Sequence, residues 1–286
     1  MSCPFLQVYF NKFRAKPMEY IHIPIYSTGE KMKIKVKKII ENIKSEFQDI
    51  SVVDTDIFGR CLVIDGVIQG TDDDSDIYDR EMLKFLKRTD EKILILGGGD
   101  GSLAESILEK NPHAHIQVID LDVEVINCCK KHFGQKIFDD PRVNLYIGDA
   151  LHHMKSTIKK INGKFDGIIC DLTDIPIGRK KKKDFVNFYE ELIAISSKVL
   201  QKNGWMSIQA GASETNGYYL NMIKIVEGIA KKHFSRVSRS DVFIPSFGEK
   251  GAFLFIEKIA KKSLLRGFRA YRSPVRLTMK EKYATV

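Results

Sequence analysis

Residues 92–102 read KILILGGGDGS, an apolar run that ends in three glycines, an aspartate and a fourth glycine. The apolar residues 93–96 have the length and the turn-bounded setting of a buried strand, and helix-forming residues follow from Leu103 to Glu109. Glycines at 97–99 leave no Cβ on the turn, so its backbone can approach a ligand closely. The stretch predicts a strand, a tight turn and a helix, either as a nucleoside-binding turn or as a purely structural one.

Asp100, inside this turn, limits which nucleoside the turn accepts. The carboxylate of intact S-adenosylmethionine would be repelled by an aspartate that points toward it. A decarboxylated ligand offers only an ammonium on a three-carbon arm, which an aspartate holds as an ion pair. The turn therefore indicates decarboxylated S-adenosylmethionine as the ligand.

Downstream of Glu91, apolar strand-like runs alternate with helical stretches, as in βαβ units. This order predicts a mostly parallel sheet with helices on both faces. The expected strands are 93–96, 116–119, 144–147, 165–170, 205–209 and 252–257. Several of them are followed by or end in an acid or an amide, namely Asp120, Asp149, Asp171 and Gln209. Because open α/β sheets bind ligands at the carboxyl ends of their strands, we expect these side chains to converge on one crevice.

Asp120 and Asp149 have positions that suit a nucleoside. Asp120 lies about twenty residues beyond the glycine turn, where such folds place an acid that binds ribose hydroxyls. Asp149 follows the next strand and is placed to reach an adenine amino group. The alternative for each residue is an aspartate that caps a helix at a strand-to-helix junction.

The sequence FDGIICDLTDIPIG at 165–178 places two acids, Asp171 and Asp174, at the end of a buried strand. Paired acids can bind a diamine or take up a proton. An alkylamine has a pKa of about 10.4, so it is protonated at neutral pH and cannot attack until a proton is removed. We therefore expect Asp171 to serve a reaction in which an amine is the nucleophile.

The N-terminal residues, 1–82, indicate a small β-rich domain. Segments 51–57 and 60–64 are apolar and rich in β-branched residues, and Asp65-Gly66 is a strong hairpin-turn signal. Residues 34–47 fit a strand followed by a short amphipathic helix. The acidic run at 72–76 is either solvated surface or a counter-charge for a polycationic ligand.

The expected fold class is therefore α/β, with a Rossmann-like, methyltransferase-type sheet at 83–258, the small β domain before it and a basic tail at 259–286. The net charge is +9, but 179–183 carries +5 and the tail +7, so the rest of the chain carries −3. Two basic segments on an acidic body do not favour a nucleic-acid-binding protein. Nucleic-acid binding through the basic loop and tail remains the alternative.

The five cysteines form neither a CxxC pair nor a metal-ligand spacing, so we expect buried thiols of a reducing compartment and no metal. No apolar run is long enough to cross a membrane, and the N-terminal MSCPFLQVYF lacks a signal-peptide pattern. The sequence predicts a cytoplasmic protein that does not bind a membrane.

Between Phe47 and Glu257 the motifs resemble those of the polyamine aminopropyltransferases, the spermidine and spermine synthases. They are FQDI at 47–50, DGVIQ at 65–69, Asp74 followed by Tyr78, GGGDG at 97–101, Asp120, GDA at 148–150 and DLTD at 171–174, in the family's order. The resemblance implies decarboxylated S-adenosylmethionine as co-substrate, a polyamine as acceptor and no separate cofactor. It also implies a homodimer joined through the N-terminal domain, whose hairpin edges at 51–69 would otherwise be unpaired.

The resemblance also implies roles for individual residues. The donor would be bound by Gln48, Gly97, Gly98, Asp100, Asp120, Asp149 and Ala150. The acceptor would be bound by Tyr78, Asp171, Asp174 and Glu249, of which Glu249 matches an acceptor-binding glutamate of spermine synthases. Asp171 is expected to be the catalytic residue that removes the acceptor's proton.

Departures from the family pattern bear on the acceptor. Tyr78-Asp79-Arg80 and Leu172-Thr173 look more like spermine synthase than spermidine synthase, whereas Asp174 follows the spermidine synthase pattern. Asp120 stands where the family commonly has Glu, and Ser102 where it has Gly. We expect spermidine as acceptor and spermine as product. The alternatives are a spermidine synthase that uses putrescine and an ordinary S-adenosylmethionine-dependent methyltransferase.

Overall fold

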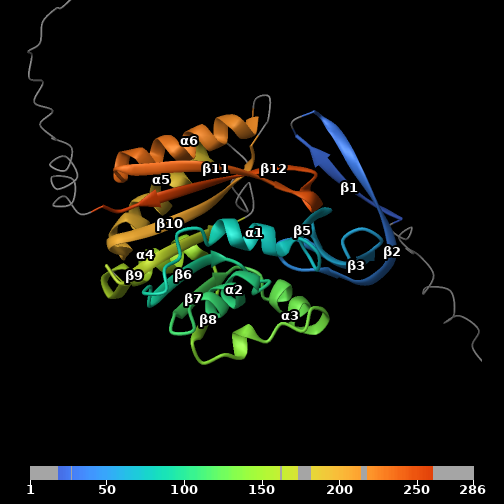
Figure 1. The fold of residues 1–286 in the computed structure, drawn as a ribbon, viewed down its shortest axis with the longest axis horizontal. Helices are drawn as coiled ribbons and strands as arrows, with labels where there is room; N and C mark the ends of the chain where they lie inside the picture. The colour runs from blue at the N-terminus through green and yellow to red at the C-terminus, as the bar shows by residue number, and fades with distance from the viewer. Residues whose placement is uncertain (1–18, 27, 162, 173–181, 214–217, 260–286) are drawn as a thin grey trace, which may run out of the picture.

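The structure, a computed structural model, describes residues 19–26, 28–161, 163–172, 182–213 and 218–259. Asp174, the start of the lysine run at 180–181 and the tail from residue 260 lie outside the described residues. The described chain forms two sheets, a five-stranded one from the N-terminal part and a seven-stranded one from the rest (Figure 1).

The N-terminal sheet is antiparallel, with its strands in sequence order. Its strands are β1 Tyr20–Ile25, β2 Glu30–Lys44, β3 Asp49–Thr55, β4 Arg60–Ile64 and β5 Val67–Thr71. The expected hairpin turn is confirmed: Ile64 pairs with Val67, and Asp65 and Gly66 both have positive φ, 49° and 81°. Two residues with positive φ give the tight turn whose twist matches that of the flanking strands.

The helix expected toward residue 47 is wrong, because β2 continues as a strand to Lys44. The register between β2 and β3 shifts twice, between Val36 and Lys38 and between Ile39 and Glu41. Each bulge adds a residue to one strand and breaks the alternation of buried and exposed side chains. The apolar residues therefore fall at positions 36, 39, 40 and 43, a spacing that imitates one face of a helix.

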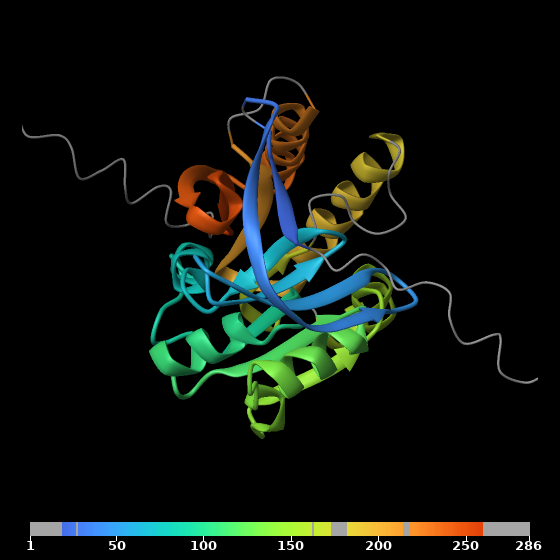
Figure 2. The same cartoon turned by 90° about the vertical axis from the view of Figure 1, so that its right-hand side faces the viewer.

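The edges of the N-terminal sheet also differ from the expectation. β3 pairs with β2 and β4 pairs with β5, so the hairpin at 51–69 is paired on the β3 side. The edge strands are β1 and β5, and these two approach each other as the sheet curls. Figure 2, which faces this sheet, shows the long β2 (blue) crossing in front of the larger sheet.

The larger sheet has the order β11-β12-β10-β9-β6-β7-β8. Its strands are β6 Lys92–Gly97, β7 His115–Asp120, β8 Val143–Ile147, β9 Phe165–Asp171, β10 Leu200–Ala212, β11 Arg236–Ile244 and β12 Glu249–Glu257. The five strands from β10 to β8 are parallel, and β12 and β11 are antiparallel additions. All six expected strands are present. The seventh, β11, is a largely polar edge strand that apolar patterning does not reveal.

Helices cover both faces of this sheet. They are α1 Ser75–Met82, α2 Ser102–Lys110, α3 Val123–His132, α4 Ala150–Ile161, α5 Lys182–Val199 and α6 Tyr218–His233, with 3₁₀ turns η1 Ile137–Asp139 and η2 Pro245–Phe247. Side chains 93 and 95 of β6 pack with α1 and α2, whereas 94 and 96 pack with α4, α5 and α6. In the described residues no helix is both long and apolar enough to cross a membrane.

The N-terminal sheet is fixed over one end of the larger sheet by its contact with α3. Buried side chains of β3 and β4, including Ile50 and Leu62, pack on Val125, Cys128 and Cys129. This burial confirms that the two neighbouring cysteines are core residues of a helix. The contact holds the small sheet beside the carboxyl ends of the parallel strands.

Candidate functional site

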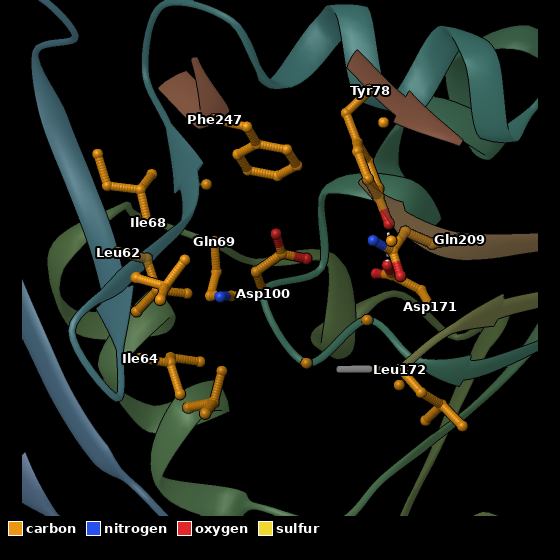
Figure 3. Close-up of a pocket in the computed structure, with 18 of the residues that line it drawn as sticks. Leu62, Ile64, Ile68, Gln69, Tyr78, Asp100, Asp171, Leu172, Gln209 and Phe247 are labelled. Carbon is orange, nitrogen blue, oxygen red and sulfur yellow. Dashed lines mark hydrogen bonds between the residues drawn. The ribbon is translucent and has the colours of Figure 1, made fainter. Parts of the chain in front are cut away.

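A cavity of about 500 Å³ lies where the N-terminal sheet meets the carboxyl ends of the parallel strands (Figure 3). The described residues that were predicted to bind donor or acceptor all line it: Gln48, Tyr78, Gly97, Gly98, Asp100, Asp120, Asp149, Ala150, Asp171 and Glu249. Gln209 lines it as well, so the four strand-end acids and amides converge as expected. The fold thus brings together residues that are up to about two hundred positions apart in the sequence.

The glycine turn is shaped by its neighbours as much as by any ligand. Gly97 has a φ of +85°, and a Cβ there would lie 1.9 Å from the carbonyl oxygen of Asp171. A Cβ on Gly99 would lie 2.7 Å from the Oδ2 of Asp120. Only glycine fits this close approach to β9 and β7. The turn therefore lies against both strand ends and carries Asp100 into the cavity.

Tyr78 and Asp171 form the central polar contact of the site. Tyr78 donates its hydroxyl hydrogen to the Oδ1 of Asp171, and Figure 3 shows Tyr78 reaching from α1 to Asp171 with Gln209 beside them. The Tyr78 ring meets Phe253 and Phe247 edge-on, at centroid distances of 5.5 Å and 6.3 Å. Burial, followed by the charge of Asp171, raises the pKa of Tyr78 well above its usual value, so Tyr78 stays a hydrogen-bond donor.

Asp171 has the properties of a proton acceptor. Burial raises its pKa to about 7, and the nearby charge of Asp100 adds to the shift, while the hydrogen bond from Tyr78 opposes it. A carboxyl group with a pKa near neutral exchanges protons readily at working pH. The arrangement can hold an amine and take its proton.

The acids predicted to bind the nucleoside differ in their surroundings. Asp120 accepts a hydrogen bond from the amide of Asp122 at 2.9 Å, and burial raises its pKa to about 6. The residue that caps α3 is Asp122, whose Oδ1 accepts from the amide of Glu124. Asp149 accepts a hydrogen bond from the amide of His152 at 2.8 Å, as a capping aspartate does. Asp149 therefore has a structural role whatever it binds.

Gln48 is held in place where the N-terminal sheet contacts the loop that follows β7. Its Nε2 donates to the Oδ2 of Asp122 at 3.0 Å, and Ser45 donates its hydroxyl to the same oxygen at 2.6 Å. Gln48 is thus tied to the loop that follows β7, beside Asp120.

Asp79 is a cavity residue that the sequence analysis did not select. It is 4% exposed, and it accepts hydrogen bonds from Ser106 at 2.8 Å and Ser102 at 3.2 Å. Burial raises its pKa to about 7, with a further contribution from the charge of Asp100. It follows Tyr78 on α1, but consecutive helical residues point to different sides, so a role for Tyr78 does not carry over to Asp79. Tyr78 faces the sheet and Asp79 faces α2.

The acidic run at 72–76 separates into residues with different roles. Asp74 is 4% exposed, accepts the hydroxyl hydrogen of Thr71 at 2.6 Å and accepts from the amide of Ser246 at 2.7 Å. It therefore ties the start of α1 to η2. The prediction of a solvated surface position is wrong for Asp74, which is buried. Arg80 is exposed and lies 4.0 Å from Asp76, so its charge is on the outer side of α1.

Glu249 lines the cavity from the start of β12. It is 8% exposed and accepts a hydrogen bond from the amide of Tyr26 at 3.1 Å. The contact joins β12 to the end of β1, so this part of the cavity wall is built by both sheets. Gln69 and Asp100, labelled in Figure 3, face the interior of the cavity from the N-terminal sheet and from the glycine turn.

One group of three side chains in the described part of the chain has the composition of a metal site: Glu41, Cys128 and His132. The Oε1 of Glu41 accepts from Lys131 at 2.6 Å, and its Oε2 contacts the Nε2 of His132. Burial also raises the pKa of the Cys128 thiol to about 11, which disfavours the thiolate. Both carboxylate oxygens are engaged, so Glu41 joins β2 to α3 through its ion pair with Lys131 and its hydrogen bond with His132.

Comparisons with known proteins agree with this architecture. A family model described as the spermine/spermidine synthase domain matches residues 77–265, and one described as the spermidine synthase tetramerisation domain matches residues 20–72. Polyamine aminopropyltransferase 1 of Hyperthermus butylicus is 30% identical over 226 residues, which cover 77% of this chain and 75% of that protein.

Two further comparisons extend the result. Spermine synthase of Arabidopsis thaliana is 31% identical over 237 residues, which cover 80% of this chain and 62% of that protein. A solved spermidine synthase in complex with the transition-state analogue AdoDATO has a TM-score of 0.72 at 22% identity, covering 88% of this chain and 85% of that one. At this identity the structural likeness establishes the fold.

Proposed function

The chain belongs to the spermine/spermidine synthase family, and from this membership we propose that it moves the aminopropyl group of decarboxylated S-adenosylmethionine to a polyamine. The observation that carries the donor assignment is Asp100, held inside the cavity by the glycine turn. A carboxylate at this place attracts the ammonium of the decarboxylated donor and repels the carboxylate of the intact one.

In the proposed complex the donor occupies the half of the cavity next to β7 and β8. Asp120 and Gln48 hold the ribose end, and Asp149 with Ala150 holds the adenine. The glycines of the turn leave room for the sulfonium. Asp100 pairs with the ammonium at the end of the aminopropyl arm. The sulfonium is already a good leaving group, so the proposed reaction needs no separate cofactor or metal.

The chemical step is a displacement at the carbon next to sulfur. The acceptor nitrogen forms a bond to this carbon, the carbon–sulfur bond breaks, and its electron pair stays on sulfur to give neutral methylthioadenosine. The proton of the attacking amine passes to Asp171, whose raised pKa suits this transfer. Tyr78 orients Asp171, and alignment of the amine with the reacting carbon supplies much of the rate.

We further propose spermidine as the acceptor and spermine as the product. Spermidine carries one more ammonium than putrescine, so its site needs an anionic contact beyond the reacting nitrogen. Glu249, which is buried and lines the wall that both sheets build, would make this contact. Arg80 lies beside Asp76 on the outer side of α1, so its positive charge does not face the acceptor in the cavity. Higher kcat/KM on putrescine than on spermidine would contradict this choice.

We also propose that the protein is a homodimer joined through the N-terminal sheet. The match of residues 20–72 to a tetramerisation domain supports association through this part of the chain. Exposed apolar side chains lie on it, including Ile57, which is 59% exposed, and Tyr20 and Tyr26. Light scattering at micromolar concentration tests the assembly, and a monomer would contradict it.

Calorimetric titration with two donors tests the proposed activity against a methyltransferase. Decarboxylated S-adenosylmethionine should bind at least roughly tenfold more tightly than the intact form, since one pairs with Asp100 and the other is repelled by it. Methylthioadenosine, which lacks the arm, should bind with intermediate affinity. Tighter binding of intact S-adenosylmethionine would contradict aminopropyl transfer.

A further inference from the structure

The hydroxyl of Ser102 lies between two carboxyl groups at the edge of the cavity. Its Oγ is 3.2 Å from the Oδ1 of Asp79, and it is 3.3 Å and 3.2 Å from the Oδ1 and Oδ2 of Asp100. Asp79 comes from α1, Asp100 from the glycine turn and Ser102 from the start of α2. Both carboxyl groups line the cavity.

Counting protons shows what this arrangement accommodates. A serine hydroxyl has one hydrogen, so it can donate to only one of the two carboxyl groups at a time. Its contact with the other group becomes a hydrogen bond only when that carboxyl carries the proton and donates to the serine oxygen. Ser106 donates to the Oδ2 of Asp79 at 2.8 Å, so Ser102 contacts the other oxygen, Oδ1. The geometry accepts two carboxyl groups that hold one proton between them.

The charges that face Asp79 favour the same state. Burial raises the pKa of Asp79 and the charge of Asp100 raises it further, whereas Lys110, exposed at the end of α2, acts in the opposite direction. Asp79 in turn contributes to the raised pKa values of Asp171 and Tyr78. Burial also raises the pKa of Asp100. Two buried carboxyl groups that interact strongly titrate as a pair, and the first proton they take up is held at unusually high pH.

We propose that Asp79 is a positioning residue that acts on Asp100 through Ser102. In the empty cavity Asp79 and Asp100 share one proton across the Ser102 hydroxyl, and the proton leaves when a ligand ammonium binds at Asp100. The inference rests on the proposed function, because it takes the aminopropyl ammonium of the decarboxylated donor as that ligand. The added positive charge stabilises both carboxylates, so the pair then carries two negative charges.

The pH dependence of donor binding follows from this exchange. Below neutral pH the pair must give up its proton before the donor binds, so affinity rises as the pH increases through about 7. In Asp79→Asn the amide can still accept from Ser102, but the pair has no proton to share. The variant should therefore match the wild type near pH 6 and bind the donor roughly three- to tenfold more weakly near pH 8.5, where it lacks the second charge.

The experiment counts protons released on binding. Calorimetric titrations at pH 7 in two buffers with different ionisation enthalpies give the number directly. The ligands are decarboxylated S-adenosylmethionine and methylthioadenosine, which has no ammonium. The matched control is Asp76→Asn, which removes an exposed carboxylate from the same helix. With the decarboxylated donor, wild type and Asp76→Asn should release roughly half a proton more than Asp79→Asn does. With methylthioadenosine all three should release the same number.

Two results would overturn the inference: equal proton release by wild type and Asp79→Asn with the decarboxylated donor, or an equal Asp79 effect with methylthioadenosine. If Asp79→Asn does not fold, Ser102→Ala replaces it: the Ser102 hydrogen bonds lower the pKa of both carboxyl groups, so their loss should increase the proton release above that of the wild type. A decarboxylated donor that binds normally without these differences removes only the role of Asp79. A wild-type protein that binds methylthioadenosine but not the decarboxylated donor contradicts the proposed function, and the inference with it.

Discussion

Replacing Asp171 with Asn separates catalysis from folding. The side chain keeps its size, and its amide oxygen can still accept the hydrogen bond from Tyr78. It cannot take a proton from an amine. We expect Asp171→Asn to keep the affinity for the donor and to lower turnover by roughly 10²-fold or more, the scale of a positioned acid or base.

The pKa of Asp171 also sets the pH dependence of the wild type. With a pKa of about 7, roughly nine tenths of the group is ionised at pH 8 and about one tenth at pH 6. Turnover should therefore be about tenfold lower at pH 6 than at pH 8. In Asp171→Asn this dependence should be lost, because the group that causes it is absent.

The same substitution should stabilise the fold at alkaline pH. The folded-state pKa of Asp171 is raised from 3.8 to about 7, so the folded protein binds the proton more tightly than the unfolded chain does. Stability from this group falls as the pH rises from about 4 to about 7 and stays low above that. A shift of three pKa units corresponds to about 4 kcal/mol, and water in the open cavity screens the charge, so we expect a gain of roughly 1–2 kcal/mol at pH 8.

The assay measures methylthioadenosine release between pH 5.5 and 9 and urea unfolding at pH 5 and pH 8, on wild type and variant. Asp76→Asn is the control, because it removes an exposed carboxylate of α1. Near-normal turnover of Asp171→Asn, or a retained acid limb in its pH profile, would refute the assignment of Asp171 as the proton acceptor. Destabilisation at pH 8 would refute the electrostatic argument.

Three other substitutions test separate parts of the structure. Asp100→Ala should weaken binding of the decarboxylated donor by at least roughly tenfold and leave methylthioadenosine nearly unchanged; equal losses in calorimetry would mean that Asp100 only shapes the turn. Glu249→Gln should raise KM for spermidine several-fold and leave KM for putrescine nearly unchanged in steady-state assays. Trp205→Phe removes the indole that donates to buried Asp90 at 2.8 Å, so urea unfolding should show a loss of about 1–3 kcal/mol, with an unchanged midpoint as the contrary result.

Much of the larger sheet and of its binding edge follows from local sequence. The apolar run before GGGDG predicts β6, and the acids and amide at the strand ends predict which side chains meet, because parallel strands present their carboxyl ends together. These features depend on residues that are close in the sequence. The parts that depend on distant contacts were not predictable in the same way.

The clearest example is β2, where two bulges against β3 give apolar residues a helix-like spacing. The buried state of Asp74 depends on the amide of Ser246, which lies 172 positions further along the chain. Asp79 is a similar case, since its role becomes visible only when α1 packs against α2 and brings it to Ser102. A single sequence shows neither which strand supplies a bulge nor which helix faces a carboxyl group.

The most direct test of aminopropyl transfer is product analysis. The full chain is incubated with decarboxylated S-adenosylmethionine and one acceptor, spermidine in one reaction and putrescine in another. The products are then separated and identified by mass spectrometry. We predict methylthioadenosine together with an amine lengthened by one aminopropyl group, formed most efficiently from spermidine. Absence of a lengthened amine with every acceptor, or transfer of a methyl group from intact S-adenosylmethionine instead, would contradict the account.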